Sequence, residues 1–497
     1  MAKPLNAIFV QKALLQANYF PSQKRDNEEI PPVFSTEALT LLPAKAVHRI
    51  RMQRKRGFDL VAYRVTRHNN IQRIMSIPHP KPYIDLVFTI FNHWKEIKYI
   101  CENDKSLIVP RRHKDGRLII MNYERSYFAN ARIWENSFAK RFRVKTDISS
   151  CYPSIYSHAV PWALVGFDTA KKAQFDSRWW FNQVDKCQMM LCRNETSGLP
   201  IGPATSNILV EAILARVDNK LQDYTYCRHI DDFAGYFETH ENAKKFILKL
   251  SYELESFKLR LNEKKTTIEE LPVASCSDWI VSLQNHFPAK TLNHSDVVLF
   301  FDYAVNVQKN NPDESVLKYA AKMVIGREKT DTAIKACIQY ILQLSFYYPV
   351  LVSLLDKPLT TSLFDGRRCP KQLNDLLKDS INYRRSDVMC WILFYLLRHN
   401  MALRRDEAKG IVKTKDAFTL TLLSLFQEHA SDVVTFAKQL DSNDPYELDQ
   451  YWILRYQLYY KGLLKKKKIS QKYELPVFDI MKKHEVSFLK LICLNHD

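Results

Sequence analysis

Apolar and polar positions repeat with two different periods along the chain, and the period predicts where helices and strands lie. Residues 80–100 carry apolar side chains at helical spacing after prolines that favour a helix start. Residues 143–148 and 225–237 alternate with the two-residue period of strands, and residues 107–122 predict a β-hairpin with its turn at residues 114–116. This part of the chain therefore mixes helices and strands.

The pattern changes from about Val305 onward, where long amphipathic segments replace the strand-like alternation. These segments predict a domain of stacked helix pairs, with helices at residues 315–325, 332–347, 386–398, 417–439 and 446–463. Only 10 of the 497 residues are glycine, which fits helices with few tight turns. The longest apolar run, residues 388–397, is far shorter than the roughly 20 residues that cross a bilayer, so we expect no membrane contact.

Positive charge is concentrated in the N-terminal part. Lys plus Arg number 73 against 54 for Asp plus Glu, a formal net charge of +19. Residues 45–73 hold nine Lys and Arg against one acid, and residues 105–145 hold eleven against three. One-sided clusters with interleaved aromatic residues are typical of surfaces that bind nucleic-acid phosphates, and a surface that only favours solubility is the alternative. The first cluster supplies the candidate nucleic-acid contacts Arg54, Lys55, Arg56 and Arg73.

Ten cysteines are scattered without a CxxC pair or a Cys/His pattern of zinc spacing, which argues against a structural metal site. The N-terminal residues lack the apolar core of a signal peptide. We therefore expect reduced thiols and a cytoplasmic location.

Three acidic residues stand at the ends of predicted strands. Asp147 comes at the end of one strand, and Asp231 and Asp232 lie at the bend between two others. Two divalent ions about 4 Å apart need bridging carboxylates and an open face for a triphosphate, which such an arrangement supplies. An Asp pair alone is weak support, because Asp is common in turns.

A glycine-bearing loop and a basic segment accompany these acids along the chain. The loop, GLPIGPATSN at residues 198–207, has two glycines around a proline and leads into a predicted helix. Glycines at such positions permit a close approach of the backbone to a ligand, and an ordinary loop-to-helix cap is the alternative. The basic segment, LNEKKT at residues 261–266, follows the Asp pair.

Together the four segments resemble motifs A, B, C and D of the palm of reverse transcriptases, in the same order. The resemblance implies that Asp147, Asp231 and Asp232 are catalytic. It further implies that these acids and the Ile148 carbonyl hold two Mg²⁺ ions, with Mn²⁺ as the alternative metal. Tyr152 falls where the family carries an aromatic residue that blocks a ribose 2'-OH, which favours deoxynucleotides.

The same resemblance implies a nucleotide-binding site around the acids. Lys265 falls at the motif D lysine that attends the pyrophosphate leaving group. The segment RRHKDGRLIIM at residues 111–121 resembles the fingers hairpin whose basic residues grip the triphosphate. The implied nucleotide-binding residues are Arg112, Arg117, Ile148, Tyr152, Ile201, Gly202 and Lys265.

Two departures narrow the resemblance. His229 replaces the usual tyrosine of motif C, and Ile201 replaces the usual glutamine of motif B, which argues against conventional processive copying. With the segments DISSCYPSIYSHAVPWAL, GLPIGPATSN and DQYWILRYQLYY, the chain resembles the abortive-infection and unknown-group reverse transcriptases of bacteria, an antiphage defence class. This class implies an α+β fold, in which right-hand fingers and palm are followed by an all-α helical-repeat domain in place of the usual thumb.

We therefore expect a basic N-terminal extension with fingers at residues 1–145, a palm at 146–300 and a helical domain at 301–497. The implied function is RNA-directed, or weakly templated and protein-primed, DNA synthesis from dNTPs in the bacterial cytoplasm. The implied partners are RNA, including a dedicated noncoding RNA, the DNA product, and further copies of the chain in a homo-oligomer. A degenerate polymerase that serves as an RNA-binding scaffold is the alternative, and Tyr152 disfavours an RNA-synthesising enzyme.

Overall fold

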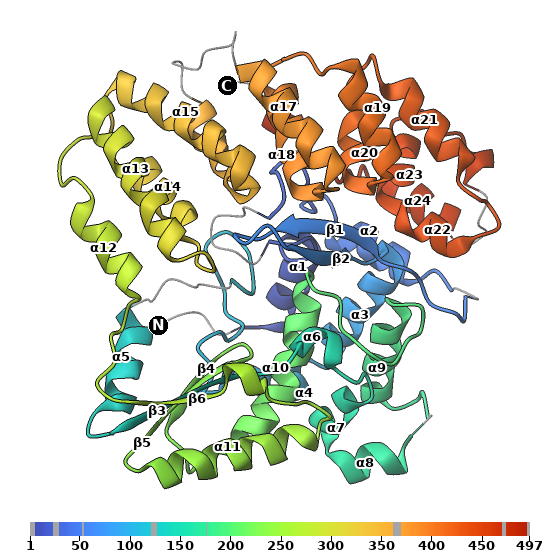
Figure 1. The fold of residues 1–497 in the computed structure, drawn as a ribbon. Coiled ribbons are helices and arrows are strands. Elements are labelled where there is room, and N and C mark those ends of the chain that lie inside the picture. Colours follow the sequence, from blue (N-terminus) through green and yellow to red (C-terminus); the bar gives the residue numbers. More distant parts are fainter. Residues whose placement is uncertain are drawn as a thin grey trace.

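The structure, a computed structural model, describes residues 5–22, 29–51, 54–120, 127–174, 176–360, 369–469 and 474–494. Residues 121–126, which belong to the second basic cluster and include the end of the predicted hairpin, lie outside these ranges. The strands all lie before residue 271, and every later element of the described chain is a helix. Figure 1 shows the helical part above the part that contains the strands. This arrangement confirms the predicted α+β fold class with a helical C-terminal region.

A four-stranded antiparallel sheet carries the segments that resemble motifs A, C and D. Its strand order is β4-β5-β3-β6, with bounds β3 (Phe142–Asp147), β4 (Tyr226–His229), β5 (Asp232–Phe237) and β6 (Thr267–Glu270). Helix α11 (His240–Glu255) covers one face, where its Phe246 packs against Tyr226 and Phe237. Gly235 allows this packing, because a Cβ there would lie 2.8 Å from the Phe237 ring. The strands predicted at 143–148 and 225–237 are thus confirmed.

A second, two-stranded sheet was not predicted. It is the hairpin β1 (Val61–Thr66) and β2 (Gln72–Ile77), which lies between the four-stranded sheet and the helical region (Figure 1). The predicted hairpin at 107–122 has its turn, where the His113 carbonyl accepts from the Gly116 N–H at 3.2 Å. Its described residues form no strands, so the strand part of that prediction is wrong. Strand pairing there is limited to a few backbone bonds, such as Arg111 N–H to the Leu118 carbonyl at 3.0 Å.

Helices surround the two sheets in the first 270 residues. The predicted helix at 80–100 is present but ends at Asn92, and a short helix follows it. The buried helix after the motif B loop is apolar on nearly all sides and runs through the centre of this part. The bounds are α1 (Ala7–Gln16), α2 (Leu41–His48), α3 (Pro80–Asn92), α4 (Trp94–Ile97), α5 (Tyr127–Ser137), α6 (Cys151–Ser154), α7 (Ala159–Val165), α8 (Phe167–Lys172), α9 (Trp180–Met190) and α10 (Ala204–Asn219).

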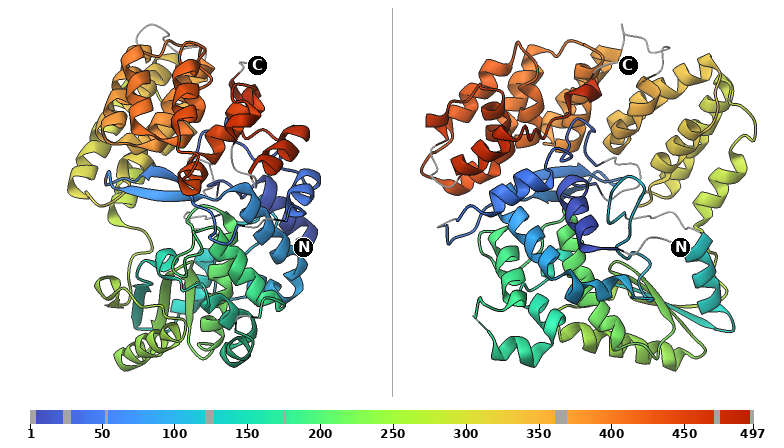
Figure 2. Two further views of the ribbon diagram at one scale, coloured as in Figure 1. Left: turned by 90° about the vertical axis from the view of Figure 1, so that its right-hand side faces the viewer. Right: turned by 180° about the vertical axis from the view of Figure 1, so that it is seen from behind.

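The C-terminal region consists of packed helices, as Figure 2 shows from two further sides. Three of the five predicted helices appear as single elements close to the predicted bounds. The helices predicted at 417–439 and 446–463 are each divided in two by turns that lack Pro or Gly. The bounds are α12 (Asp278–His286), α13 (His294–Asn310), α14 (Val316–Gly326), α15 (Asp331–Tyr347), α16 (Asp356–Leu359), α17 (Cys369–Asn382), α18 (Ser386–Arg398), α19 (Arg405–Thr414), α20 (Ala417–Leu423), α21 (Ala430–Gln439), α22 (Pro445–Gln450), α23 (Trp452–Tyr460) and α24 (Glu474–Lys483).

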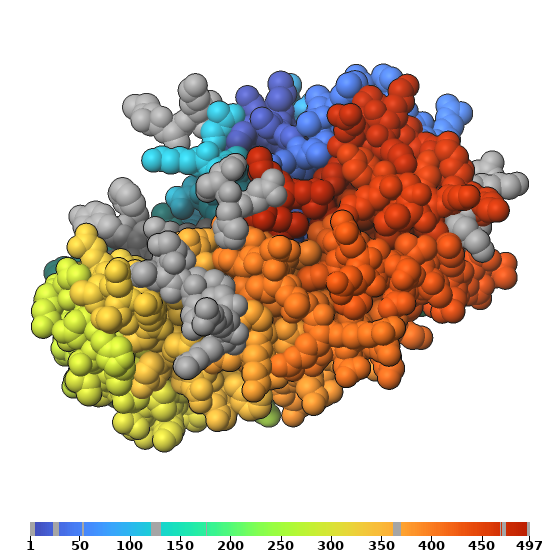
Figure 3. Space-filling model, turned by 90° about the horizontal axis from the view of Figure 1, so that it is seen from above, coloured from blue at the N-terminus to red at the C-terminus, as the bar shows by residue number. Residues whose placement is uncertain are grey.

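The N-terminal residues and the C-terminal helices share one hydrophobic core. Phe34 forms a β-bridge with Leu489, and the Lys490 N–H donates to the Val33 carbonyl at 2.7 Å. Figure 3, seen from above, shows the N-terminal segments in blue beside the last helices in red. None of the described helices has the length and apolar character needed to span a bilayer.

Candidate active site

The three acids meet at one end of the four-stranded sheet. The register of β3 and β5 pairs Asp147 with Asp232, and the Ile148 N–H donates to the Asp231 carbonyl at 3.2 Å. Directly paired residues of antiparallel strands have Cβ atoms about 5 Å apart. The backbone therefore brings together side chains that lie more than 80 residues apart in the sequence.

The turn that presents Asp231 has an unusual backbone. Ile230 adopts φ of 59°, a left-handed conformation that is strained for a β-branched residue. The Arg228 guanidinium is fully buried and its Nη1 donates to the Ile230 carbonyl at 2.6 Å. Arg228 also forms ion pairs with Glu211 at 2.8 Å and Asp218 at 2.7 Å, both on α10. This network fixes the turn between β4 and β5 to the helix beneath it.

Sequence reasoning missed this network, although a signal for it was present. Glu211 and Asp218 interrupt an otherwise apolar helix and lie seven residues apart, a spacing that places both on one face. Buried carboxylates need a cationic partner, and Arg228 in the adjacent strand is the residue that provides it.

The electrostatics of the acids favour the binding of a cation. Loss of hydration raises the pKa of Asp231, and the nearby Asp147 adds to this effect. The pKa of Asp232 is raised for the same reason, with further contributions from Asp231 and Asp147. Lys265 Nζ donates to Asp147 Oδ2 at 2.6 Å, which raises the pKa of that lysine. One cation of the protein itself thus already contacts the acidic group.

The donor set fits a hard divalent metal. Asp147 is 7% exposed, and its Oδ1 is buried without a hydrogen-bond partner in the described chain. A cation there would satisfy this oxygen, and carboxylate and carbonyl oxygens suit Mg²⁺ and Mn²⁺. Among the described residues, no three His, Cys, Asp or Glu side chains are gathered closely enough to hold one ion.

Tyr152 is fixed in position between two segments of the site. It lies in α6, five residues after Asp147, and its phenol oxygen accepts from Asn207 Nδ2 at 2.8 Å. The Leu199 N–H donates to the Tyr152 carbonyl at 2.9 Å. Asn207 lies inside α10 rather than at its cap, which is Pro203. The ring is therefore held by contacts with both the loop and the helix of motif B.

The motif B loop packs against the β1–β2 hairpin. The Ser76 N–H donates to the Ile201 carbonyl at 2.7 Å. Gly202 has φ of 136°, and a Cβ there would lie 3.3 Å from Pro21 Cγ and 3.4 Å from the Ser76 carbonyl oxygen. The close approach that Gly202 permits is therefore to the protein's own chain, which differs from the nucleotide contact that the resemblance implied.

The two arginines expected to grip a triphosphate contact the protein itself. The Arg112 guanidinium lies 4.3 Å from the centre of the Phe9 ring. Arg117 is 6% exposed, pairs with Asp115 at 2.7 Å and donates to the Ser22 carbonyl at 2.7 Å. The expectation that Arg117 presents its charge to a triphosphate does not fit these contacts. Arg73 on β2 is closer to the acids, since its charge lowers the pKa of Asp231.

The basic segment at residues 54–56 is divided between the interior and the surface. Arg54 is 6% exposed and forms a two-pronged ion pair with Asp449, with Nη1 and Nη2 donating at 2.9 and 2.5 Å. A surface phosphate contact does not fit this position, and we assign Arg54 to the fold. Lys55 and Arg56 are exposed, as predicted for nucleic-acid contacts.

Part of the chain matches a known protein family. Residues 113–292 match the family model described as reverse transcriptase (RNA-dependent DNA polymerase). This match covers the three acids, Tyr152, the motif B loop and Lys265. No curated protein sequence matches the chain.

Solved structures with a similar fold include telomerases from two yeasts. Apo telomerase from Candida tropicalis has 11% identity and a TM-score of 0.34, with 78% of this chain and 70% of that chain covered. Telomerase from Candida albicans with a fragment of telomeric RNA has 10% identity and a TM-score of 0.30, with 80% and 68% covered. A truncated Candida tropicalis telomerase has 12% identity and a TM-score of 0.31, with 46% and 53% covered. The chain thus spans only about half the length of that truncated telomerase.

The family match and the site agree on the same residues. The strand-borne acids, the loop before α10 and Lys265 all fall inside the matched range. Reverse transcriptase domains use divalent metal ions, which agrees with the oxygen donors found here. Residues 113–292 of this chain form a reverse transcriptase domain, the domain type of RNA-dependent DNA polymerases, which are nucleotidyltransferases.

Proposed function

We propose that the protein is a DNA polymerase that transfers deoxynucleotides to a growing 3'-OH at Asp147, Asp231 and Asp232. The observation that carries this proposal is the pairing of Asp147 with Asp232 across β3 and β5, with Asp231 in the adjoining turn. Mg²⁺ ions, or Mn²⁺, would be held by Asp147, Asp231 and the Ile148 carbonyl. When bound, such ions activate the attacking hydroxyl and neutralise the charge on the triphosphate.

The surrounding residues have distinct parts in this reaction. Asp232 adds negative charge that favours the metals, and the Tyr152 ring, fixed by Asn207, excludes a ribose 2'-OH. Lys265 contacts Asp147 in the free protein and is placed to donate a proton to the leaving pyrophosphate. The Arg73 charge, which acts on Asp231, is suited to meet the triphosphate.

The finer assignment is to the abortive-infection and unknown-group reverse transcriptases of antiphage defence. It is supported by the motif segments and by the helices that follow the strand-containing part. As part of this assignment we also propose weakly templated or protein-primed synthesis, binding of a dedicated noncoding RNA, and assembly into a homo-oligomer in the bacterial cytoplasm. The domain division at residues 145 and 300 belongs to the same proposal.

Nucleotide incorporation tests the catalytic proposal. Purified protein with Mg²⁺ and labelled dNTPs should incorporate dNTPs but not NTPs. Asp231→Asn with Asp232→Asn should abolish incorporation, while circular dichroism and unfolding temperature stay as in the parent. Incorporation by the double variant at the parent rate would refute the site assignment.

A second candidate function is an RNA-binding scaffold without polymerase activity. It is favoured by His229 and Ile201, which depart from the usual residues of motifs C and B, and by the contact of Lys265 with Asp147. RNA binding by a parent protein that incorporates no dNTP with either Mg²⁺ or Mn²⁺ would select this alternative.

A further inference from the structure

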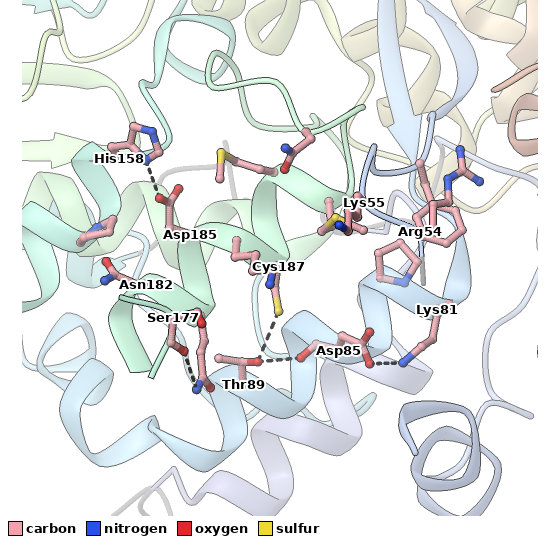
Figure 4. A pocket seen from close by; sticks show the side chains of 18 of the residues that line it. Arg54, Lys55, Lys81, Asp85, Thr89, His158, Ser177, Asn182, Asp185 and Cys187 are labelled. Atoms are coloured by element: carbon pink, nitrogen blue, oxygen red, sulfur yellow. Dashed lines mark hydrogen bonds and ion pairs between the residues drawn. The ribbon is translucent and has the colours of Figure 1, made fainter. Parts of the chain in front are cut away.

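A cavity away from the catalytic acids has the features of a binding groove. It has a volume of about 930 Å³ and lies where residues 48–50 and 54–58 meet α3, α8 and α9 (Figure 4). Asp147, Asp231 and Asp232 are not among its lining residues. The nucleotidyl-transfer site described above therefore does not account for it. We call it the α3/α9 groove.

Positive charge in the α3/α9 groove is available to a ligand. Lys55, Lys171 and Lys186 line it and are exposed. No acid of the described chain lies within ion-pair distance of Lys55 or Lys186. The other cations differ, because Lys81 pairs with Asp85 at 2.7 Å and Arg54 with Asp449. The groove therefore presents lysine ammonium groups suited to phosphates.

The backbone next to Lys55 is anchored at the edge of this groove. Arg54 is anchored by its buried ion pair, and the Phe58 N–H donates to the Met190 carbonyl at 2.9 Å. Gly57 lies against the chain at Asn194, where a Cβ would come within 2.6 Å of the backbone nitrogen. The residues on both sides of Lys55 are thus fixed, and less entropy is lost when it binds a phosphate.

A histidine lies at the other end of the groove from Lys55. The Asp185 carboxylate accepts from His158 Nδ1 at 2.5 Å, which fixes the ring and leaves Nε2 for a ligand (Figure 4). Asp185 is almost fully buried, whereas the His158 side chain is 30% exposed. Figure 4 shows His158 and Lys55 on opposite sides of this cavity.

Exposed aromatic rings accompany the basic residues. Phe167 and Trp179 are 52% and 50% exposed. Phe167 lies on α8 with the lining residue Lys171, and Trp179 lies two residues after the lining residue Ser177, directly before α9. Lys171 Nζ lies 5.7 Å from the centre of the Phe167 ring. Cations interleaved with exposed aromatic rings are the surface that binds single-stranded nucleic acid, through phosphate contacts and base stacking.

We propose that the α3/α9 groove binds single-stranded RNA outside the polymerase site. The proposal rests on the proposed function, in which RNA is the partner of a polymerase. The amide and hydroxyl side chains of Gln174, Ser177 and Gln183 line the groove and can contact the 2'-OH groups that distinguish RNA from DNA. The lysines contact phosphates, and Trp179 stacks on a base.

Charge reversal in the groove tests this proposal. Labelled single-stranded RNA is titrated by fluorescence anisotropy against the full chain at several salt concentrations. Lys55→Glu with Lys186→Glu should raise the Kd at least about tenfold and lower the slope of log Kd against log salt by about 1.4, the value for two phosphates. Trp179→Ala should raise the Kd about tenfold through lost stacking.

A control variant with the same charge change outside the groove shows whether a loss of RNA binding is specific to the groove. Lys220→Glu with Lys244→Glu carries the same charge change on exposed residues outside the groove and should bind RNA nearly as the parent does. An equal loss in both double variants, or none in the groove variant at parent-like unfolding temperature, overturns the proposal. A loss confined to single-stranded DNA of the same sequence also overturns it.

The catalytic double variant separates this proposal from the proposed function. Asp231→Asn with Asp232→Asn should bind RNA with the parent Kd while it incorporates no dNTP. If the parent incorporates no dNTP, the proposed polymerase function fails. The RNA titration with the groove variants then still shows whether the α3/α9 groove binds RNA. If the catalytic variant loses RNA binding and the groove variants do not, the RNA binds at the polymerase site, and the proposal that the α3/α9 groove binds RNA is refuted.

Discussion

At the scale of single residues, the two carboxylate oxygens of Asp147 differ in their hydrogen bonding. Asp147 Oδ2 accepts a hydrogen bond from Lys265 at 2.6 Å, whereas its Oδ1 is buried without a partner in the described chain. Lys265 itself is 65% exposed, so this contact is readily exchanged. The lysine and a divalent ion therefore compete for one carboxylate.

Removal of this competitor should strengthen metal binding. Lys265→Met should bind Mg²⁺ or Mn²⁺ about two- to fivefold more tightly in the absence of nucleotide, the range expected when an exposed ion pair is lost. Its rate of dNTP incorporation should fall, because the leaving pyrophosphate loses its donor. Titration calorimetry checks the affinity, with Lys264→Met as the control for an exposed neighbouring lysine. Equal metal affinities of the two variants would contradict the competition.

Tyr152 provides a second prediction at this scale, because its ring and its hydroxyl have separate roles. Tyr152→Phe leaves the buried Asn207 amide without its partner, which should lower the free energy of unfolding by about 1–3 kcal/mol. If the ring is the group that meets the 2'-OH, as proposed above, sugar selection should persist in Tyr152→Phe and be lost in Tyr152→Ala. Incorporation of dNTPs and NTPs by both variants is the measurement, and unchanged selection in Tyr152→Ala would remove its gating role.

At the scale of elements, charged side chains connect segments that are distant in the sequence. Arg228 joins β4 to α10 through Glu211 and Asp218 and supports the turn before Asp231. Arg54 joins the basic segment to α22 through Asp449, which lies 395 positions later in the sequence. A buried ion pair of this kind gives little net stability, but the loss of one partner leaves an uncompensated charge.

The Arg54 contact can be tested against its exposed neighbour. Arg54→Ala leaves the Asp449 carboxylate, which is 1% exposed, without its cationic partner, although the Asp59 N–H still donates to it at 2.8 Å. It should lower the free energy of unfolding by about 3–5 kcal/mol. Arg56→Ala removes the same charge from the surface and should change stability by no more than about 0.5 kcal/mol. Thermal or denaturant unfolding is the measurement, and equal effects would place Arg54 on the surface after all.

At the scale of the whole molecule, the two ends of the chain stabilise each other. Phe418 of α20 contacts the rings of Phe20, Phe34 and Tyr63. Asp387 of α18 accepts from the Thr66 N–H at 2.7 Å and from its hydroxyl at 3.0 Å, inside the core. The N-terminal residues and β1 therefore bury their apolar surface against the helical region.

Division of the chain tests this dependence. Residues 1–300 expressed alone should aggregate or unfold, because the surface buried against α18 and α20 becomes exposed. Coexpression with residues 301–497 should restore a soluble complex that copurifies. Size-exclusion chromatography and limited proteolysis are the measurements. A fragment 1–300 that unfolds cooperatively by itself would contradict this dependence.

The sequence determined the elements that depend on local pattern. Strand alternation and motif order placed Asp147, Asp231 and Asp232 at strand ends, and the amphipathic period located helices such as α15 and α18. The breaks that divide two predicted helices could not be found, because tertiary packing ends a helix without Pro or Gly as well as with them.

Only the tertiary structure decided which side chains meet. Arg54 and Arg117 carry the same charge as their exposed neighbours, yet Asp449 and Ser22 bind them in the interior. The β1–β2 hairpin, the Arg228 network and the α3/α9 groove likewise join residues from separate segments. A linear pattern records the period and the residue type, whereas burial and ion pairing depend on contacts between segments that only the folded chain brings together.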